Sequence, residues 1–137
     1  MIYVILSTLL FGLTLFFIKL SAVKISPLIG SAVFGASSLI IQMIVIFVSK
    51  YQGNKFNITA EGVRISIFGG VILGAYTVLL FLAFSKMGIT KVTPTVYVGA
   101  ILISSLLGIL FLGEKMNYIN MIGIFLALSG LTLLFVK

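Results

Sequence analysis

The side chains that could do chemistry in this sequence are few. Its 137 residues contain no His and no Cys, and its two acidic residues are Glu61 and Glu114. Metal sites need clustered His, Cys or carboxylate ligands, and acid–base or nucleophilic catalysis needs a base beside the reacting group. We therefore predict no catalytic residue, no metal site, no cofactor and no enzymatic activity.

Hydroxyl and aromatic side chains remain as candidates for substrate contact. Five of them lie within apolar stretches of the chain: Thr14, Tyr76, Thr77, Thr95 and Tyr97. The stretches hold no acidic residue of the kind for which substrate and proton compete in exporters of organic cations. A substrate recognised by hydroxyls, aromatic faces and helix ends is therefore more compatible with this sequence than a bare cation. For each residue the alternative is a hydroxyl bonded to its own helix, or a Tyr at the membrane interface.

Glu114 stands in a short connection, after Leu112-Gly113 and before Lys115. The C-terminal end of a helix disfavours a carboxylate, whereas the free amides at the start of the next helix favour it. We expect Glu114 to fix the connection between the last two apolar stretches. The alternative is a role in ion coupling.

Five apolar stretches must position these residues. We predict them at residues 2–18, 27–48, 63–85, 94–112 and 118–136. Each is close to the ~20 residues that cross a bilayer as a helix. Lipid cannot hydrogen-bond a free backbone group, and the stretches do not alternate as barrel strands do. The predicted fold class is an all-α integral membrane protein with five transmembrane helices, in which residues 1–137 form one domain.

The nine Lys and Arg residues divide almost evenly between the two sides that five spans define. The side of the N-terminus holds Lys50, Lys55, Arg64 and Lys115, and the opposite side holds Lys19, Lys24, Lys86, Lys91 and Lys137. Basic residues in short loops normally set orientation, so this balance predicts insertion both ways, with a single orientation as the alternative. The basic residues stand singly at span ends, which favours contact with the lipid bilayer. They form no basic stripe that could bind nucleic acid.

The same spacing of two Lys residues, a hydroxyl residue and a Pro occurs twice, and it predicts two helix hairpins with the same capping arrangement. The two copies are Lys19, Lys24, Ser26, Pro27 and Lys86, Lys91, Thr93, Pro94. Pro is favoured at the first helical position, and a hydroxyl residue before it can cap the free amides. We expect Pro27 and Pro94 each to open a helix beyond a connection that begins at Lys19 or Lys86. The alternative is a pair of related gates around a pathway.

Small residues form stripes that predict close helix packing within or between subunits. They are Gly70 and Gly74, then Ala100, Ser104 and Gly108, then Gly123 and Ala127, together with the run from Gly30 to Ser38.

These motifs together resemble EamA-type members of the drug/metabolite transporter superfamily. The matching residues are Phe11-Gly12, Thr14, Lys19 and Ser26-Pro27, then Pro94, the run from Leu110 to Lys115, and Gly123 and Gly130. The chain has Phe11 where the family often has Trp and Phe34 where it often has Arg. Neither stacking nor charge recognition is therefore carried over to those positions.

The resemblance implies a ten-helix body of two five-helix repeats with opposite topology, which moves small molecules by alternating access around a central site. This five-helix chain resembles one repeat. We therefore expect transport of a small-molecule substrate by an antiparallel, dual-topology homodimer, or by pairing with a paralogous five-helix partner, in the plasma or inner membrane of a prokaryote. The alternative is a noncatalytic membrane subunit of a heteromeric transporter or lipid-carrier flippase.

Overall fold

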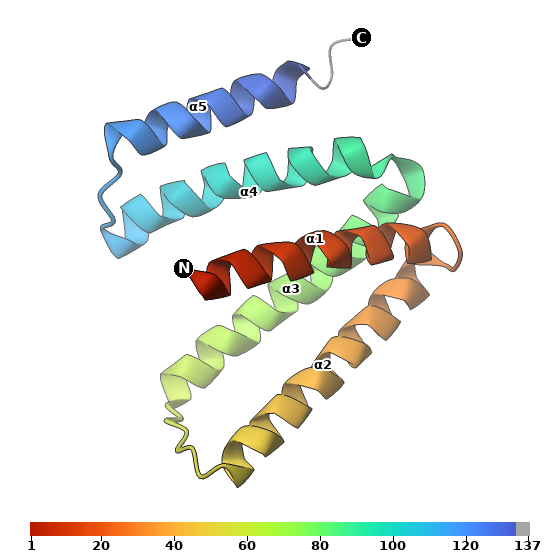
Figure 1. Cartoon of the computed structure of the whole chain (residues 1–137), viewed down its shortest axis with the longest axis vertical. Coiled ribbons are helices and arrows are strands. Elements are labelled where there is room, and N and C mark those ends of the chain that lie inside the picture. The colour runs from red at the N-terminus through yellow and green to blue at the C-terminus, as the bar shows by residue number, and fades with distance from the viewer. Residues whose placement is uncertain (134–137) are drawn as a thin grey trace. The chain divides into compact units, whose positions relative to one another are not determined.

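The computed structural model describes residues 1–133, and its regular elements in that range are helices (Figure 1). They are α1 (Ile2–Ala22), α2 (Pro27–Tyr51), α3 (Ala60–Lys86), α4 (Ile89–Leu112) and α5 (Tyr118–Leu133). The first four are long and apolar enough to cross a membrane, and α5 is a shorter apolar helix. The end of the predicted last span, at 134–136, lies outside the described residues. The predicted all-α membrane fold is confirmed.

The chain divides into two compact units, the first containing α1 to α3 and the second α4 and α5. In the first unit α2 and α3 run antiparallel, joined by residues 52–59, and α1 packs on both of them (Figure 1). In the second unit α4 packs on α5. Hydrogen bonds inside each helix satisfy most of its backbone, which is the condition for crossing lipid.

The buried side chains of the first unit gather at one end of it. Leu15, Ile18 and Ala22 come from the last turns of α1, and Leu80, Phe81 and Phe84 come from the last turns of α3. Phe81 and Phe84 are 1% and 0% exposed. We call this cluster, together with Gly30 and Ser31 at the start of α2, the closed end.

Gly30 brings α2 against the other two helices at the closed end. A Cβ atom built on Gly30 would lie 2.6 Å from Cε1 of Phe81 and 3.3 Å from Oγ of Ser21. Because no larger residue fits this space without movement of the Phe81 ring, the glycine permits the close approach of the backbones. Phe34, one turn further along α2, packs on the same ring, with centroids 6.1 Å apart.

Lys19 links α1 to the end of α3. Its Nζ atom donates a hydrogen bond of 2.6 Å to the main-chain oxygen of Phe84. Phe84 lies in the last turn of α3, where carbonyl groups lack partners within the helix and the helix dipole is negative. The ammonium group therefore caps α3 while it ties the two helices together.

The two predicted hairpins do not have the same capping arrangement. Helix α2 begins at Pro27 with Ser26 at its N-cap, although the Ser26 side chain makes no capping hydrogen bond. Helix α4 begins at Ile89, after an extended Gly88, so Pro94 lies inside the helix and the prediction that it opens one is wrong. The amides of Lys91 and Val92 bond to the Gly88 carbonyl and start the helix early. Pro94 has no amide hydrogen for the carbonyl four residues before it.

Candidate functional site

A groove of about 600 Å³ runs between α2 and α3 in the first unit. We call it the α2–α3 groove. Its polar lining residues are Ser31, Ser38, Gln42 and Thr77, and its small ones are Ala32, Gly35, Gly70 and Gly74. Leu28, Phe34, Leu39, Leu73 and Val78 complete the lining. None of these thirteen residues is charged, so the groove is largely apolar with a few polar groups and offers no counter-ion for a charged ligand.

The glycines of the groove differ from Gly30 in what surrounds them. A Cβ atom built on Gly35, Gly70 or Gly74 would meet nothing within 4 Å. Within the first unit, therefore, these residues do not bring helices into contact, and their small size leaves the groove open. The predicted packing role is seen at Gly30, and within the first unit it is not seen at these three positions.

The hydroxyl groups of the groove are bonded to their own helices. Ser31, Ser38 and Thr77 donate to the main-chain oxygens of Leu28, Gly35 and Leu73, at 2.8, 2.9 and 2.7 Å. Each hydroxyl proton is thereby engaged, and the oxygen keeps its acceptor lone pairs. Gln42 is different, since its side-chain amide makes no hydrogen bond among residues 1–133.

The five residues predicted to contact substrate lie on three helices of the two units. Thr77 lines the α2–α3 groove, and the other four residues do not. Tyr76 is partly buried on α3, and Thr14 on α1 donates to the Leu10 carbonyl at 2.8 Å. Thr95 and Tyr97 belong to α4 in the second unit, where Thr95 donates to the Lys91 carbonyl at 2.7 Å. Thr14, Thr77 and Thr95 each donate to a carbonyl of their own helix, as the alternative interpretation of these residues predicts.

Sequence reasoning missed the polar residues that α2 contributes. Ser31 and Ser38 fall in the run of small residues that predicted packing, and their position opposite Thr77 depends on how two distant segments pack. Gln42 did carry a signal. It places an amide in the middle of the apolar run from Leu39 to Phe47, and an amide within a membrane span needs a partner or water.

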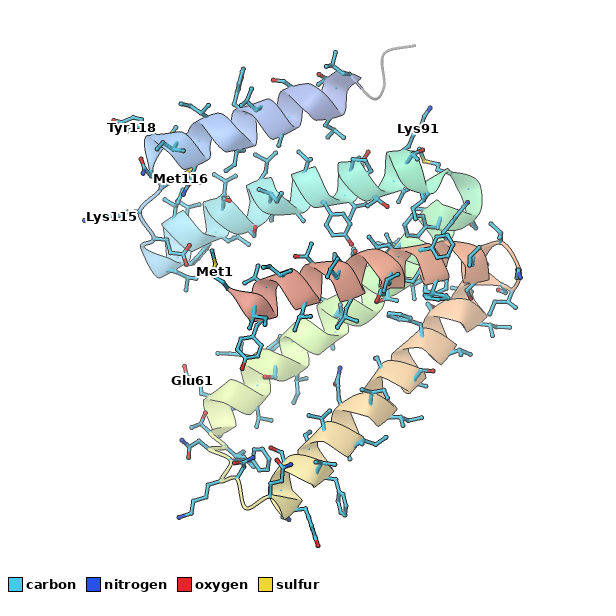
Figure 2. All side chains as sticks on the ribbon, in the orientation of Figure 1. Met1, Glu61, Lys91, Lys115, Met116 and Tyr118 are labelled. Atoms are coloured by element: carbon cyan, nitrogen blue, oxygen red, sulfur yellow. The ribbon has the colours of Figure 1, made fainter. Side chains whose placement is uncertain are left out.

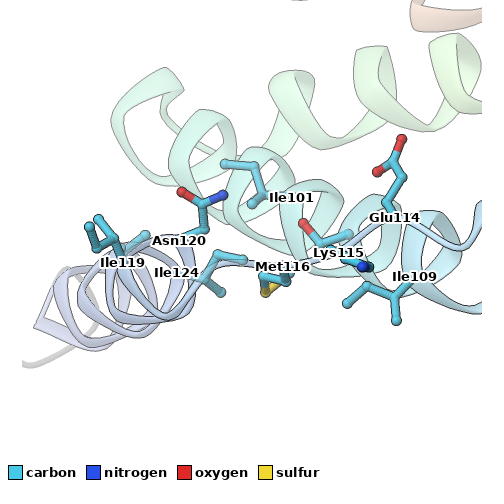
Figure 3. Close-up of a pocket in the computed structure, with 11 residues that line it drawn as sticks. Ile101, Ile109, Glu114, Lys115, Met116, Ile119, Asn120 and Ile124 are labelled. Carbon is cyan, nitrogen blue, oxygen red and sulfur yellow. The ribbon is translucent and has the colours of Figure 1, made fainter.

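The second unit holds a cleft of about 460 Å³ between α4, the connecting residues and α5 (Figure 3). Glu114, Lys115 and Asn120 lie along it. Helix α4 ends at Gly113, whose φ of 65° is left-handed, and the amide of Glu114 turns back to the Gly108 carbonyl at 3.1 Å. Glycine is favoured at such a position because it has no Cβ atom.

Glu114 lies against α4 and not at the start of α5. Its Oε2 atom is 2.6 Å from the position that a Cβ atom on Gly108 would take. Helix α5 begins only at Tyr118. The left-handed turn at Gly113 directs the chain back, so the carboxylate of Glu114 lies over α4, and its role in fixing the connection stays a prediction.

Charged residues stand at the ends of the helices. Figure 2 shows Glu61 at the start of α3, Lys91 in the first turn of α4 and Lys115 between α4 and α5. Among residues 1–133, no three His, Cys, Asp or Glu side chains come together to hold a metal ion. The apolar middle of each long helix is thus left for lipid, for other helices and for the groove.

Comparison with known proteins identifies one matching family. No curated protein and no solved structure matches the sequence significantly. The model of the EamA-like transporter family matches residues 1–136, which is almost the whole chain. The match agrees with the helical membrane fold and with the resemblance of the sequence motifs. This multi-pass membrane protein therefore belongs to the EamA-like transporter family.

Proposed function

We propose that this chain carries a small molecule across the membrane by alternating access, as one half of a ten-helix body. A second copy in the opposite orientation supplies the other half. The observation that carries this proposal is the shape of the first unit. Its closed end is tightly packed, while the α2–α3 groove beside it is open and carries four polar residues on a largely apolar lining.

The polar groups of a groove on a membrane helix pair need cover. Unpaired polar groups in hydrocarbon cost free energy, so the groove is more stable against a second protein surface or a water-filled pathway than against lipid tails. In transporters built from inverted repeats, the substrate site lies where the two repeats meet. An inverted second copy would cover this groove and complete such a site.

The charge distribution supports self-pairing in opposite orientations. Four basic residues flank the spans on one side and five on the other, including Lys137 outside the described residues. A chain with so small a bias has little reason to prefer one orientation. We place the assembly in the plasma membrane of a prokaryote and assign it transport without catalysis.

The first experiment determines the orientation of the chain. A reporter that is active only in the cytoplasm and one that is active only outside are each fused to the C-terminus of the chain, expressed as the sole copy. We expect both fusions to be active. Activity of one fusion alone contradicts dual insertion and favours a heteromer with a paralogous subunit, such as a flippase half. A fusion of a membrane protein with a strong charge bias provides the control.

The second experiment tests whether the α2–α3 groove is open to water. The chain contains no Cys, so single cysteines can be introduced without removing any. We expect a cysteine in the α2–α3 groove, at Ser38, to react with a water-soluble maleimide faster than one at Val45. Val45 lies on α2 with 61% of its surface exposed and is not part of the groove. Thiols react as thiolates, which require water, so equal rates contradict a hydrated pathway.

A further inference from the structure

We propose that the amide of Gln42 selects the substrate, and that the α2–α3 groove takes an uncharged molecule with an amide-like donor and acceptor beside an apolar group. This inference rests on the proposed transport function and names the substrate class of the same pathway. Its first support is the position of Gln42, an exposed amide on α2 that lines the groove and lies within an apolar run.

The absence of charge from the groove favours an uncharged substrate. Its thirteen lining residues contain no acidic and no basic side chain. A full charge held in a low-dielectric site needs a partner of opposite charge. A neutral molecule loses much less hydration free energy on entering the same space.

The hydrogen-bonding groups of the groove specify which neutral molecule fits. Ser31, Ser38 and Thr77 use their protons on their own helices, so they present only acceptor lone pairs to a ligand. The amide of Gln42 offers both a donor and an acceptor in one plane. A ligand amide can pair with Gln42 through both groups, and its remaining N–H can reach a hydroxyl oxygen. The ring of Phe34 gives an apolar surface in the same lining.

The space beside Gln42 has the size of a small-molecule site. About 600 Å³ lies within the range of roughly 300 to 1,000 Å³ that such sites occupy. Within the first unit Gly35, Gly70 and Gly74 support no contact between helices, so their small size serves the space itself. The competing occupant is a helix of the second copy, seated on the same glycines.

The test uses the full chain in membrane vesicles, with Ser38→Cys as the reporter and N-ethylmaleimide as the label. Benzamide, benzylammonium and benzoate are three probes of one size that differ in charge. We expect benzamide to slow labelling and the two ions to leave it unchanged. Equal protection by benzylammonium, or no protection by benzamide, overturns the assignment.

Variants of Gln42 separate recognition from structure. We expect Gln42→Leu to weaken protection by benzamide by roughly tenfold, the effect of losing about one buried hydrogen bond. We expect Gln42→Glu to transfer protection to benzylammonium, because its carboxylate supplies the missing counter-ion. Unchanged benzamide protection in both variants overturns the role of Gln42, since a residue that only supports the fold would not change the preferred charge.

Two further results distinguish this inference from the proposed function. If Ser38→Cys is unlabelled and Gln42→Cys cross-links between copies, a helix of the second copy fills the groove. The inference and the hydrated groove then fail, while the pairing of two copies stands. If only one of the two C-terminal reporters is active, dual insertion fails whatever the probes show. If the three probes protect Ser38→Cys equally, only the proposed substrate class is contradicted.

Discussion

Gly30 and Gly74 lie on the two helices that border one groove, yet their surroundings are opposite. A Cβ atom on Gly30 would collide with the buried ring of Phe81, whereas one on Gly74 would meet nothing within 4 Å. The first glycine belongs to a packed contact and the second to an open surface. Small residues in membrane helices are usually assigned to packing. The comparison shows that the same residue type closes one end of this unit and leaves the groove open along its length.

The largest effect is expected at the closed end. Gly30→Ala forces the Phe81 ring, only 1% exposed, to move or the helices to separate. We expect a loss of about 1–3 kcal/mol in the free energy of unfolding, as for other overpacked cores. Unfolding in SDS, followed by circular dichroism, measures it. A loss no larger than that of Gly35→Ala would remove the distinction between the closed end and the groove.

The next largest effect concerns the cap that Lys19 places on α3. Lys19→Met keeps much of the apolar stem and removes the hydrogen bond to the Phe84 carbonyl. Because Lys19 is partly exposed, we expect a loss of about 1 kcal/mol. Lys24→Met is the control, since Lys24 is exposed in the α1–α2 connection. Equal stability of the two variants in the same SDS titration would show that the Lys19 bond does not hold the closed end.

A smaller change, of opposite sign, is expected in the groove. Gly74→Ala adds a methyl group to open space and improves helix propensity, so we expect no loss and a gain of up to about 1 kcal/mol. Gly70→Ala should behave alike. The free energy of unfolding and the fraction of cross-linked dimer are both measured. If either variant loses dimer, a helix of the second copy packs on this stripe and the groove is not free.

The smallest effect is expected at Thr77. Thr77→Val keeps the shape and removes a hydroxyl whose proton is bonded to the Leu73 carbonyl of its own helix. We expect a change below about 0.5 kcal/mol in the free energy of unfolding, since the carbonyl also belongs to the helix backbone. Thr95→Val is the matched control outside the groove. A loss above about 1 kcal/mol at Thr77 alone would indicate that the hydroxyl holds α2 to α3.

The sequence predicted the helices better than their ends. Pro27 opens α2 as its position suggested, whereas Pro94 lies within α4. The two segments carry the same pattern of Lys, hydroxyl and Pro. The difference arises at Gly88, whose extended backbone and carbonyl start α4 at Ile89. Glycine allows many conformations, so its choice here depends on packing and cannot be read from the spacing.

The candidate site was predicted only in part. Thr77 was identified because it is a polar residue in an apolar span, and that reasoning requires no knowledge of its neighbours. Ser31, Ser38 and Gln42 join it only because α2 packs antiparallel to α3. Glu114 illustrates the same limit, since its side chain lies over Gly108 after a left-handed turn that the sequence marks only with a Gly.

By itself, the sequence determined that this protein is a set of apolar helices in a membrane. Hydrocarbon forces every backbone group to find its partner locally, so span length and composition suffice for that conclusion. The tertiary structure alone decided which glycine is packed and which is open, that Lys19 caps α3, and that Gln42 shares a groove with Thr77. These features join residues far apart in the chain, and their geometry depends on how the helices pack together, which local pattern does not encode.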